Sequence, residues 1–199
     1  IIKKKMLTYN KTTQQQRLKI EYDNISESPR SWSNLGYFIT VDSNYKSPDN
    51  RQDIINIVKD TGDNATSQDD HISMIKKAMK DELNEEVIAI YPICKYEHSG
   101  VIYRLGTQHG FDISNNGFYI ITKKQQKEYE TKKKDFETII KQELEVYNSY
   151  INGEGYQFTL YDDEGEVIDA CGGFYSLDDI KDHLPEEFKS EKLEDYLIS

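Results

Sequence analysis

The residues best suited to metal chemistry are Cys94, His98 and His109, with Asp112 close by. Zinc needs three or four ligands that converge at about 2.0–2.3 Å, and structural zinc sites usually contain tight pairs such as Cys-x2-Cys. This spacing contains no such pair, and Cys94 lies in an apolar, strand-like pattern that suits a small core residue. We therefore expect neither a metal site nor a cofactor.

A nucleophilic centre would need Cys94 within reach of His98 and an orienting acid such as Glu97. Neighbours along a strand point to opposite faces, and the surrounding pattern supplies no oxyanion hole. The acidic run 162–166 lacks the 12-residue ligand alternation of a calcium loop, and no glycine-rich phosphate-binding motif occurs. The sequence thus favours a protein that is not an enzyme.

Negative charge is concentrated in the last third of the chain. Residues 142–199 carry 16 acidic side chains against 3 lysines, whereas residues 1–141 carry 20 acidic and 22 basic side chains. A field of one sign attracts oppositely charged partners, while contacts to phosphates require Lys and Arg. We therefore expect a basic protein partner and no direct binding of nucleic acid.

The composition is that of a folded chain without a membrane segment. Hydrophobic residues make up 36% of the 199 residues, and no apolar run approaches the roughly 20 residues that cross a bilayer. The two cysteines, Cys94 and Cys171, would form only one disulfide, which is an unusual framework for a chain of this length. We expect free thiols and a cytoplasmic location.

Hydrophobic periodicity predicts the elements that position these residues. Strands are expected over 17–25, 36–41, 87–93, 100–105 and 117–122, and the last three are expected to form a meander. Helices are expected over about 70–84 and about 124–150, the second ending at Asn152-Gly153. A hairpin is predicted over 155–161 and 166–171, with short helices beginning after Ser176 and at Pro185.

This order of elements predicts an α+β fold, in which an antiparallel sheet is packed by one long amphipathic helix and is followed by a C-terminal hairpin and short helices. We expect a single domain over residues 17–185, with a polar insert at about 42–86. Residues 186–199 are expected to form a C-terminal helix or tail. Trp32 is expected to pack its loop against the core.

Three stretches carry a resemblance: residues 28–36 (SPRSWSNLG), 91–100 (YPICKYEHSG) and 158–175 (FTLYDDEGEVIDACGGFY). In this order they resemble a family of small acidic proteins from bacteriophages and mobile elements of Gram-positive bacteria. The stretch that departs from the family's pattern is 42–86, which is longer and more polar. The resemblance implies a setting, and small acidic proteins in that setting are often antagonists of host defence.

Charge and resemblance together predict an anti-defence protein, anti-CRISPR or anti-restriction, that binds a host nucleic-acid-handling complex through an acidic surface in the bacterial host's cytoplasm. Two alternatives stay open: a phage-encoded hydrolase or nucleotide-modifying enzyme that uses His98, and an adaptor in phage replication or assembly. The residues expected to contact the partner are Asp162, Asp163, Glu164, Glu166, Asp178, Asp179 and Asp182, followed by Arg30, Trp32 and His98.

Overall fold

The structure is a computed structural model and describes residues 16–24, 27–42 and 44–198. The chain divides into two compact units, and each is described by itself. The central unit spans residues 25–153, and the terminal unit combines residues 1–24 with 154–199. The fold is α+β with antiparallel sheets, as predicted, but it contains two four-stranded sheets where the sequence predicted one.

The sheet of the central unit has the strand order β2-β5-β3-β4, and every pairing is antiparallel. Its strands are β2 (Tyr37–Thr40), β3 (Val87–Glu97), β4 (Val101–Leu105) and β5 (Ile113–Thr122). The predicted meander is wrong, because β5 pairs with β3 and not with β4. The apolar run that begins at Val87 is central, as expected, since β3 has a partner on each side.

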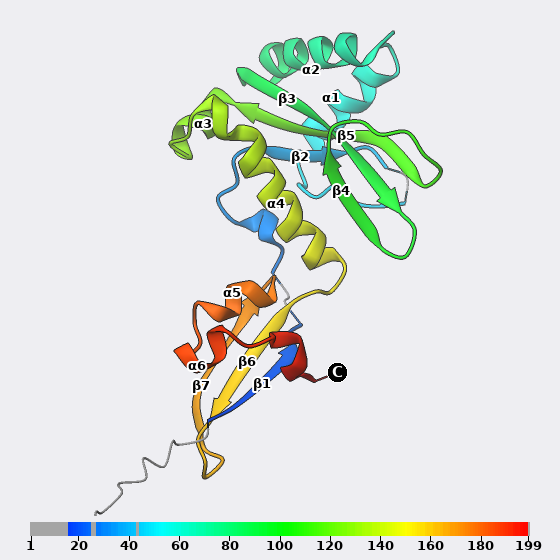
Figure 1. The fold of residues 1–199 in the computed structure, drawn as a ribbon. Coiled ribbons are helices and arrows are strands. Elements are labelled where there is room, and N and C mark those ends of the chain that lie inside the picture. Colours follow the sequence, from blue (N-terminus) through cyan, green and yellow to red (C-terminus); the bar gives the residue numbers. More distant parts are fainter. Residues whose placement is uncertain (1–15, 25–26, 43, 199) are drawn as a thin grey trace, which may run out of the picture. The chain divides into compact units, whose positions relative to one another are not determined.

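Helices cover both faces of this sheet (Figure 1). Phe136, Ile140, Leu144 and Tyr147 of α4 (Phe136–Ile151) pack on one face. The predicted helix over 124–150 is interrupted, because α3 (Lys123–Glu128) and a 3-10 turn (Lys133–Asp135) precede α4. Glu130 between them adopts φ 53°, a left-handed conformation that no α-helix continues through.

The predicted polar insert supplies the layer on the opposite face. It folds into α1 (Gln52–Gly62) and α2 (Gln68–Leu83), and the second helix agrees with the predicted helix over about 70–84. The Ser67 side chain caps α2 by accepting from the Asp70 amide at 3.2 Å. Both helices bury isoleucine, valine and methionine against β2 and β5, so the insert is part of the core of this unit.

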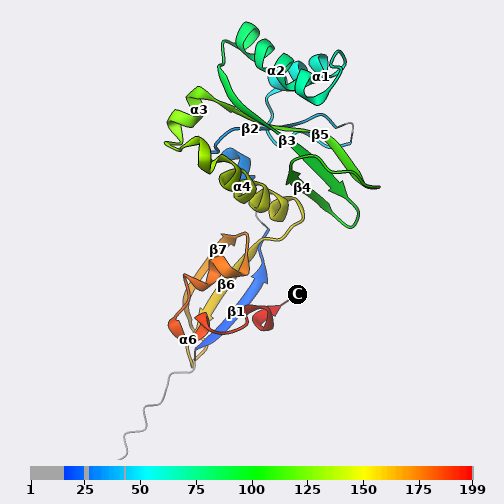
Figure 2. The same cartoon turned by 45° about the horizontal axis from the view of Figure 1, so that its top comes forward.

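The terminal unit contains a second sheet, with the order β7-β6-β1-β8 (Figure 2). Its strands are β1 (Arg17–Tyr22), β6 (Tyr156–Tyr161), β7 (Val167–Phe174) and β8 (Leu197–Ile198). The predicted hairpin is confirmed by the antiparallel pairing of β6 with β7. The predicted first strand is confirmed too, and it pairs with β6, more than 130 residues away along the chain.

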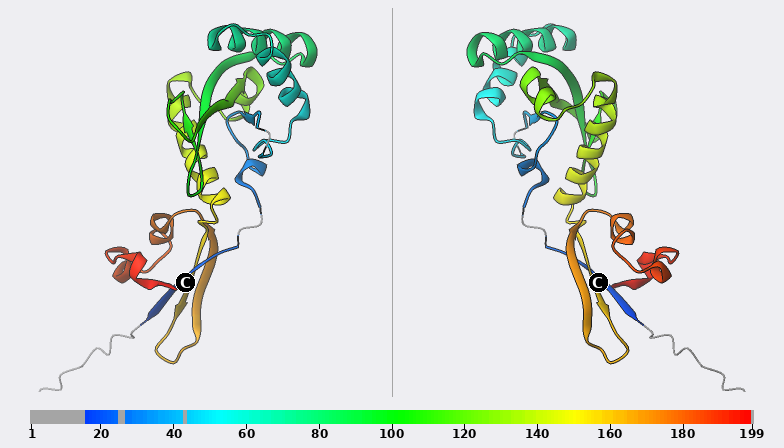
Figure 3. Two further views of the ribbon diagram at one scale, coloured as in Figure 1. Left: turned by 90° about the vertical axis from the view of Figure 1, so that its right-hand side faces the viewer. Right: turned by 90° about the vertical axis from the view of Figure 1, so that its left-hand side faces the viewer.

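Short helices cover one face of this sheet (Figure 3). They are α5 (Leu177–Lys181), α6 (Glu186–Lys189) and the 3-10 helix η3 (Leu193–Tyr196). Phe188 and Leu193 are buried in the core beside Ile20 and Phe158. Of the helix or tail expected over residues 186–199, the structure shows short helices within 186–198. The expected single domain over 17–185 differs from the two compact units that the chain forms.

Candidate functional site

The acidic turn of the β6–β7 hairpin is built around Asp162. The amide of Asp162 donates to the carbonyl of Glu166 at 3.0 Å, and Asp162 Oδ1 accepts from the Glu166 amide at 2.8 Å. Gly165 supplies φ 91°, which a residue with a side chain rarely adopts. Asp162 thus stabilises the turn, while the side chains of Asp163, Glu164 and Glu166 are exposed.

The other predicted acids lie on α5 and just after it. The Ser176 hydroxyl caps α5 by accepting from the Asp179 amide at 3.1 Å, and Asp178 and Asp179 occupy its first turn. Carboxylates are favourable there because the helix N-terminus carries partial positive charge. Asp178 also pairs with Lys181 at 2.8 Å, and Asp182 is exposed at the end of the helix. Asp178 and Asp179 therefore have a local structural role in addition to any role in binding.

The predicted acids form two patches on the terminal unit. The hairpin patch contains Asp162, Asp163, Glu164 and Glu166, and the helical patch contains Asp178, Asp179 and Asp182. Figures 1 and 2 show the turn at one end of the β6–β7 ladder and α5 at the other. The six residues of β6 separate them by roughly 20 Å, at ~3.3 Å per residue. The sequence did not predict this separation, because it depends on how β6 and β7 pair in the folded chain.

Most of this charge has no counter-ion within the unit. Residues 16–24 and 154–198 carry 16 acidic and 5 basic side chains, a net charge of −11, whereas residues 27–153 carry 20 and 16, a net charge of −4. Within the described part of the terminal unit, the ion pairs are Lys19 with Glu21, Lys181 with Asp178, and Lys189 with Glu186. The negative field of this unit is therefore largely uncompensated.

A hollow of about 810 Å³ adjoins the hairpin patch. Asp163 and Glu164 line it together with Arg17, Phe188 and Tyr196. The hollow thus combines two acidic side chains, one arginine and two aromatic rings.

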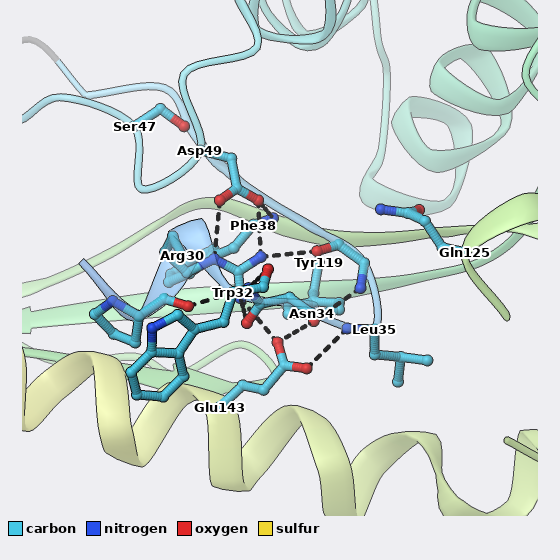
Figure 4. Close-up of polar contacts among 12 residues, drawn as sticks. Arg30, Trp32, Asn34, Leu35, Phe38, Ser47, Asp49, Tyr119, Gln125 and Glu143 are labelled. Atoms are coloured by element: carbon cyan, nitrogen blue, oxygen red, sulfur yellow. Dashed lines mark hydrogen bonds and ion pairs between the residues drawn. The ribbon is translucent and has the colours of Figure 1, made fainter. Parts of the chain in front are cut away.

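Arg30 lies in the central unit and is not available to a partner (Figure 4). Its side chain is 4% exposed, and its guanidinium uses all five N–H donors internally. Nε and Nη2 donate to the two oxygens of Asp49 at 2.9 and 2.8 Å. Nη1 donates to Glu143 at 2.8 Å and Asn34 at 3.0 Å, and Nη2 also donates to the Gly36 carbonyl at 2.7 Å. The prediction that Arg30 contacts a partner is therefore corrected.

Glu143 connects this cluster to α4. Its Oε1 accepts from the Leu35 amide at 2.8 Å, and its Oε2 accepts from the Tyr119 hydroxyl as well as from Arg30. Burial lowers the pKa of Arg30, but the hydrogen bond and charge of Asp49, with Tyr119 and Glu143, outweigh burial and raise that pKa above its ordinary value. Burial, followed by the charge of Glu143, raises the pKa of Tyr119. The loop over 28–36 is thus fixed to the sheet and to α4.

Sequence reasoning missed Asp49, Tyr119 and Glu143 as the partners of Arg30. One signal was present for Glu143, because it lies on the apolar stripe of α4, three residues after Ile140 and next to Leu144. A carboxylate on a buried helix face needs a nearby cation to offset the cost of burial. The chain has few arginines that could be this cation. Asp49 gave no such signal, since it lies in an irregular loop.

Trp32 is 51% exposed, so the expectation that it packs its loop against the core is wrong. It lines a pocket of about 410 Å³ together with Tyr37, Asn50, Arg51 and Gln125. Arg51 lies 4.6 Å from the Tyr37 ring centroid and pairs with Asp53 and Glu85 outside the pocket. The arginines that line this pocket are therefore already paired with carboxylates of the central unit.

His98 lies at the β3–β4 turn, apart from the Arg30 loop. Its side chain is 69% exposed, and Nδ1 is 3.3 Å from Asp112 Oδ2. Both line a hollow of about 670 Å³ that also contains Lys95 and the exposed Phe111. Of the four residues that the sequence offered as candidate metal ligands, the structure pairs His98 with Asp112.

Cys94 is buried, and its thiol lies 3.6 Å from the Arg104 carbonyl oxygen. Burial raises the pKa of the Cys94 thiol, which opposes thiolate formation. Both cysteines are free, and Cys171 is exposed on β7. Among the described residues, no group of three or more His, Cys, Asp or Glu side chains is placed to hold a metal ion.

Comparison of the chain with family models, with curated proteins and with solved structures finds no match. None of the helices in the described ranges is long and apolar enough to span a membrane.

Proposed function

We propose that this chain is an anti-defence protein that binds a host nucleic-acid-handling complex, a CRISPR effector or a restriction enzyme, through the acidic surface of its terminal unit. The observation that supports this most is the charge of that unit, which carries a net −11 over residues 16–24 and 154–198 with few internal ion pairs. The resemblance of 28–36, 91–100 and 158–175 to proteins of phages and mobile elements supplies the setting.

The physical basis is competition for a basic surface. Proteins that hold DNA or RNA present Lys and Arg to the phosphates, and a field of opposite sign accelerates association with such surfaces. The two acidic patches lie roughly 20 Å apart, which equals about six nucleotides at ~3.4 Å per nucleotide along one strand. An acidic unit of this length would occupy part of a nucleic-acid channel and exclude its normal ligand.

Capture from a bacterial lysate, with identification of the bound proteins, tests the proposal. The tagged full chain is expected to retain a nucleic-acid-handling defence complex, with binding that weakens as salt rises. The variant that combines Glu164→Lys with Glu166→Lys is expected to lose it. A matched control combines Asp81→Lys with Glu82→Lys, two exposed acids on α2 in the central unit. Equal loss in both variants, or binding that salt leaves unchanged, would refute the mechanism.

An enzyme is the rival, and the His98–Asp112 pair is the observation that favours it. A hydrolase of this kind would use the imidazole as a general base, oriented by the carboxylate. An inhibitor that acts through the terminal unit is expected to keep its full effect in the His98→Ala variant. Capture of phage replication or assembly proteins in place of host proteins would favour the adaptor.

A further inference from the structure

The edges of the central sheet are closed by side chains or loops. Unpaired N–H and C=O groups on an edge strand attract other strands, so proteins usually cover them. At the β4 edge, Asn148 of α4 donates to the Tyr103 carbonyl at 3.0 Å and accepts from the Tyr103 amide at 2.8 Å. Asn152, one turn later, makes the same pair of bonds to Val101 at 2.8 and 3.1 Å. These two amides take the place of a neighbouring strand.

The β2 edge is closed by the loop that follows it. The Phe38 amide donates to Asp49 Oδ2 at 2.6 Å, and the Phe38 carbonyl accepts from the Asp49 amide at 3.1 Å. The Thr40 amide donates to the Ser47 hydroxyl at 3.1 Å. Backbone groups on both edges of the central sheet thus have hydrogen-bond partners from within the unit.

In the terminal sheet, one edge is covered and the other is open. The short strand β8 pairs with β1 in parallel through Ile20 and Glu21. On the opposite edge, every residue of β7 from 167 to 173 is exposed. The amide of Ala170 donates to its neighbour Asp169 Oδ1 at 2.8 Å, so this donor is directed away from β6. Among the described residues, no strand lies beside β7 on the side away from β6.

The open edge also presents apolar surface. Val167 is 58% exposed and Ile168 is 48% exposed, at the end of β7 next to the hairpin patch. An open edge with exposed β-branched residues is the kind of surface to which an extended peptide adds as a further strand, with backbone hydrogen bonds giving affinity and side chains giving specificity.

We propose that the β7 edge binds an extended segment of the partner as a fifth strand of the terminal sheet, and that this segment carries basic side chains alternating with apolar ones. The choice of a basic segment follows from charge complementarity, because Glu166 and Asp169 flank the open backbone and the hairpin patch lies at its end. This inference rests on the proposed function for the identity of the partner, and it adds the way in which that partner is held.

A second copy of this chain is a poorer occupant of the same edge. Two β7 strands placed side by side would bring Glu166 and Asp169 of one copy close to the acids of the other, and like charges on neighbouring strands are destabilising. A basic strand instead places opposite charges there. The occupant is therefore expected to come from a basic partner.

Peptide binding to the full chain tests the inference without the natural partner. The probes are three synthetic hexapeptides: alternating Lys and Val, alternating Glu and Val, and alternating Lys and Pro. The Lys-Pro peptide has the charge of the Lys-Val peptide, but its prolines remove every second backbone donor and fix φ near about −65°, so it is a much poorer strand. The Lys-Val peptide is expected to bind about tenfold or more tightly than either control, a difference of ~1.4 kcal/mol or more.

Amide hydrogen exchange in the unaltered chain gives a second readout that needs no variant. Binding of the Lys-Val peptide is expected to slow exchange at Ala170, because its amide would then donate to a carbonyl of the added strand in place of the exposed Asp169 carboxylate. Binding without slower exchange at Ala170 would overturn the inference. So would equal binding of the Lys-Val and Lys-Pro peptides.

Substitution at Ala170 completes the test. Ala170→Pro removes the outward donor and leaves the pairing with β6 in place, since edge strands tolerate proline where the N–H points outward. Ala170→Val keeps the donor and is the matched control. The Pro variant is expected to lose the Lys-Val peptide and the Val variant to keep it. Equal binding by the two variants, or a dimer of the unaltered chain that Ala170→Pro abolishes, would contradict the assignment.

The outcomes separate this inference from the proposed function. Should Ala170→Pro retain the captured complex while the combined Glu164→Lys and Glu166→Lys variant loses it, the edge inference fails and the acidic mechanism stands. Should neither change affect capture, both proposals fail.

Discussion

The two units of the chain differ in whether their charged side chains are paired and in whether their sheet edges are covered. In the central unit, Arg30 is surrounded by Asp49 and Glu143, and both sheet edges are closed by internal hydrogen bonds. In the terminal unit, most carboxylates are exposed without a cation, and the β7 edge is open. Internal pairing contributes to folding, whereas unpaired charge and unpaired backbone are available to a partner. A partner is therefore expected to bind the terminal unit.

The largest effect is expected from removing the cation of the central unit. Arg30→Ala leaves two largely buried carboxylates without their counter-ion, which is expected to cost about 3–5 kcal/mol of unfolding free energy. Urea denaturation of the variant measures this. Lys76→Ala, at an exposed lysine of α2, is the control and should change stability by less than ~0.5 kcal/mol. A small change in unfolding free energy for Arg30→Ala would mean that the paired charges of the central unit do not stabilise it.

Opening the β4 edge is expected to have the next largest effect. Asn148→Ala leaves the amide and carbonyl of Tyr103 without partners, at a cost of about 1–3 kcal/mol for the unsatisfied groups. Hydrogen exchange at the Tyr103 amide should become faster. Gln142→Ala, at an exposed position of the same helix, should alter neither stability nor exchange at Tyr103. An unchanged Tyr103 amide would mean that Asn148 does not close this edge.

A pH-dependent prediction concerns Asp42 of the central unit, which pairs with the buried Lys95. Burial raises the pKa of Asp42, but hydrogen bonds from Lys95, Asn44 and Asn116 outweigh burial and lower that pKa below its ordinary value. The stabilisation is therefore present above the pKa of the unfolded chain and is lost as pH falls through the folded pKa. Asp42→Asn is expected to cost about 1–2 kcal/mol at pH 7.

The same variant should approach the unaltered chain in stability as pH falls below ~4, because Asp42 is then increasingly protonated in both states. Denaturation curves across this range provide the measurement. A stability difference that stays constant down to acidic pH would show that the charge of Asp42 does not contribute.

The smallest effect is expected at the hairpin patch. Asp163→Gln combined with Glu164→Gln changes exposed side chains without ion pairs among the described residues, so unfolding free energy should change by less than ~0.5 kcal/mol. Capture of the partner should nevertheless weaken. A substantial loss of stability would mean that these acids serve the fold, as Asp49 and Glu143 do.

Local patterns in the sequence predicted the local features correctly. The acidic turn between two alternating runs predicted the β6–β7 hairpin, and Asn152-Gly153 predicted the end of α4, where Gly153 has φ 72°. The apolar stripe of α2 predicted that helix within about two residues. These features depend on residues that are near neighbours along the chain, and the periodicity of side chains records them directly.

Features that depend on distant residues were not predictable in the same way. The pairing of β1 with β6, the position of β5 beside β3 and the contact of Arg30 with Glu143 each join segments that no local pattern relates. Of the candidate site, the sequence identified the acids but not their division into two patches. It identified the loop of Arg30 but assigned the arginine to a partner, because burial is a property of the fold.

The pairing of β1 with β6 has a consequence for the order of synthesis. Tyr22 and Tyr156 are opposite each other in the ladder, so the whole central unit is inserted between two adjacent strands. At roughly 5–20 residues per second, a ribosome needs on the order of ten seconds to reach β6 after β1 has emerged. During that time the central unit is able to fold, while Leu18 and Ile20 of β1 do not yet have the β6 residues with which they pair. The acidic surface is therefore completed only after α5, α6 and η3 have left the ribosome.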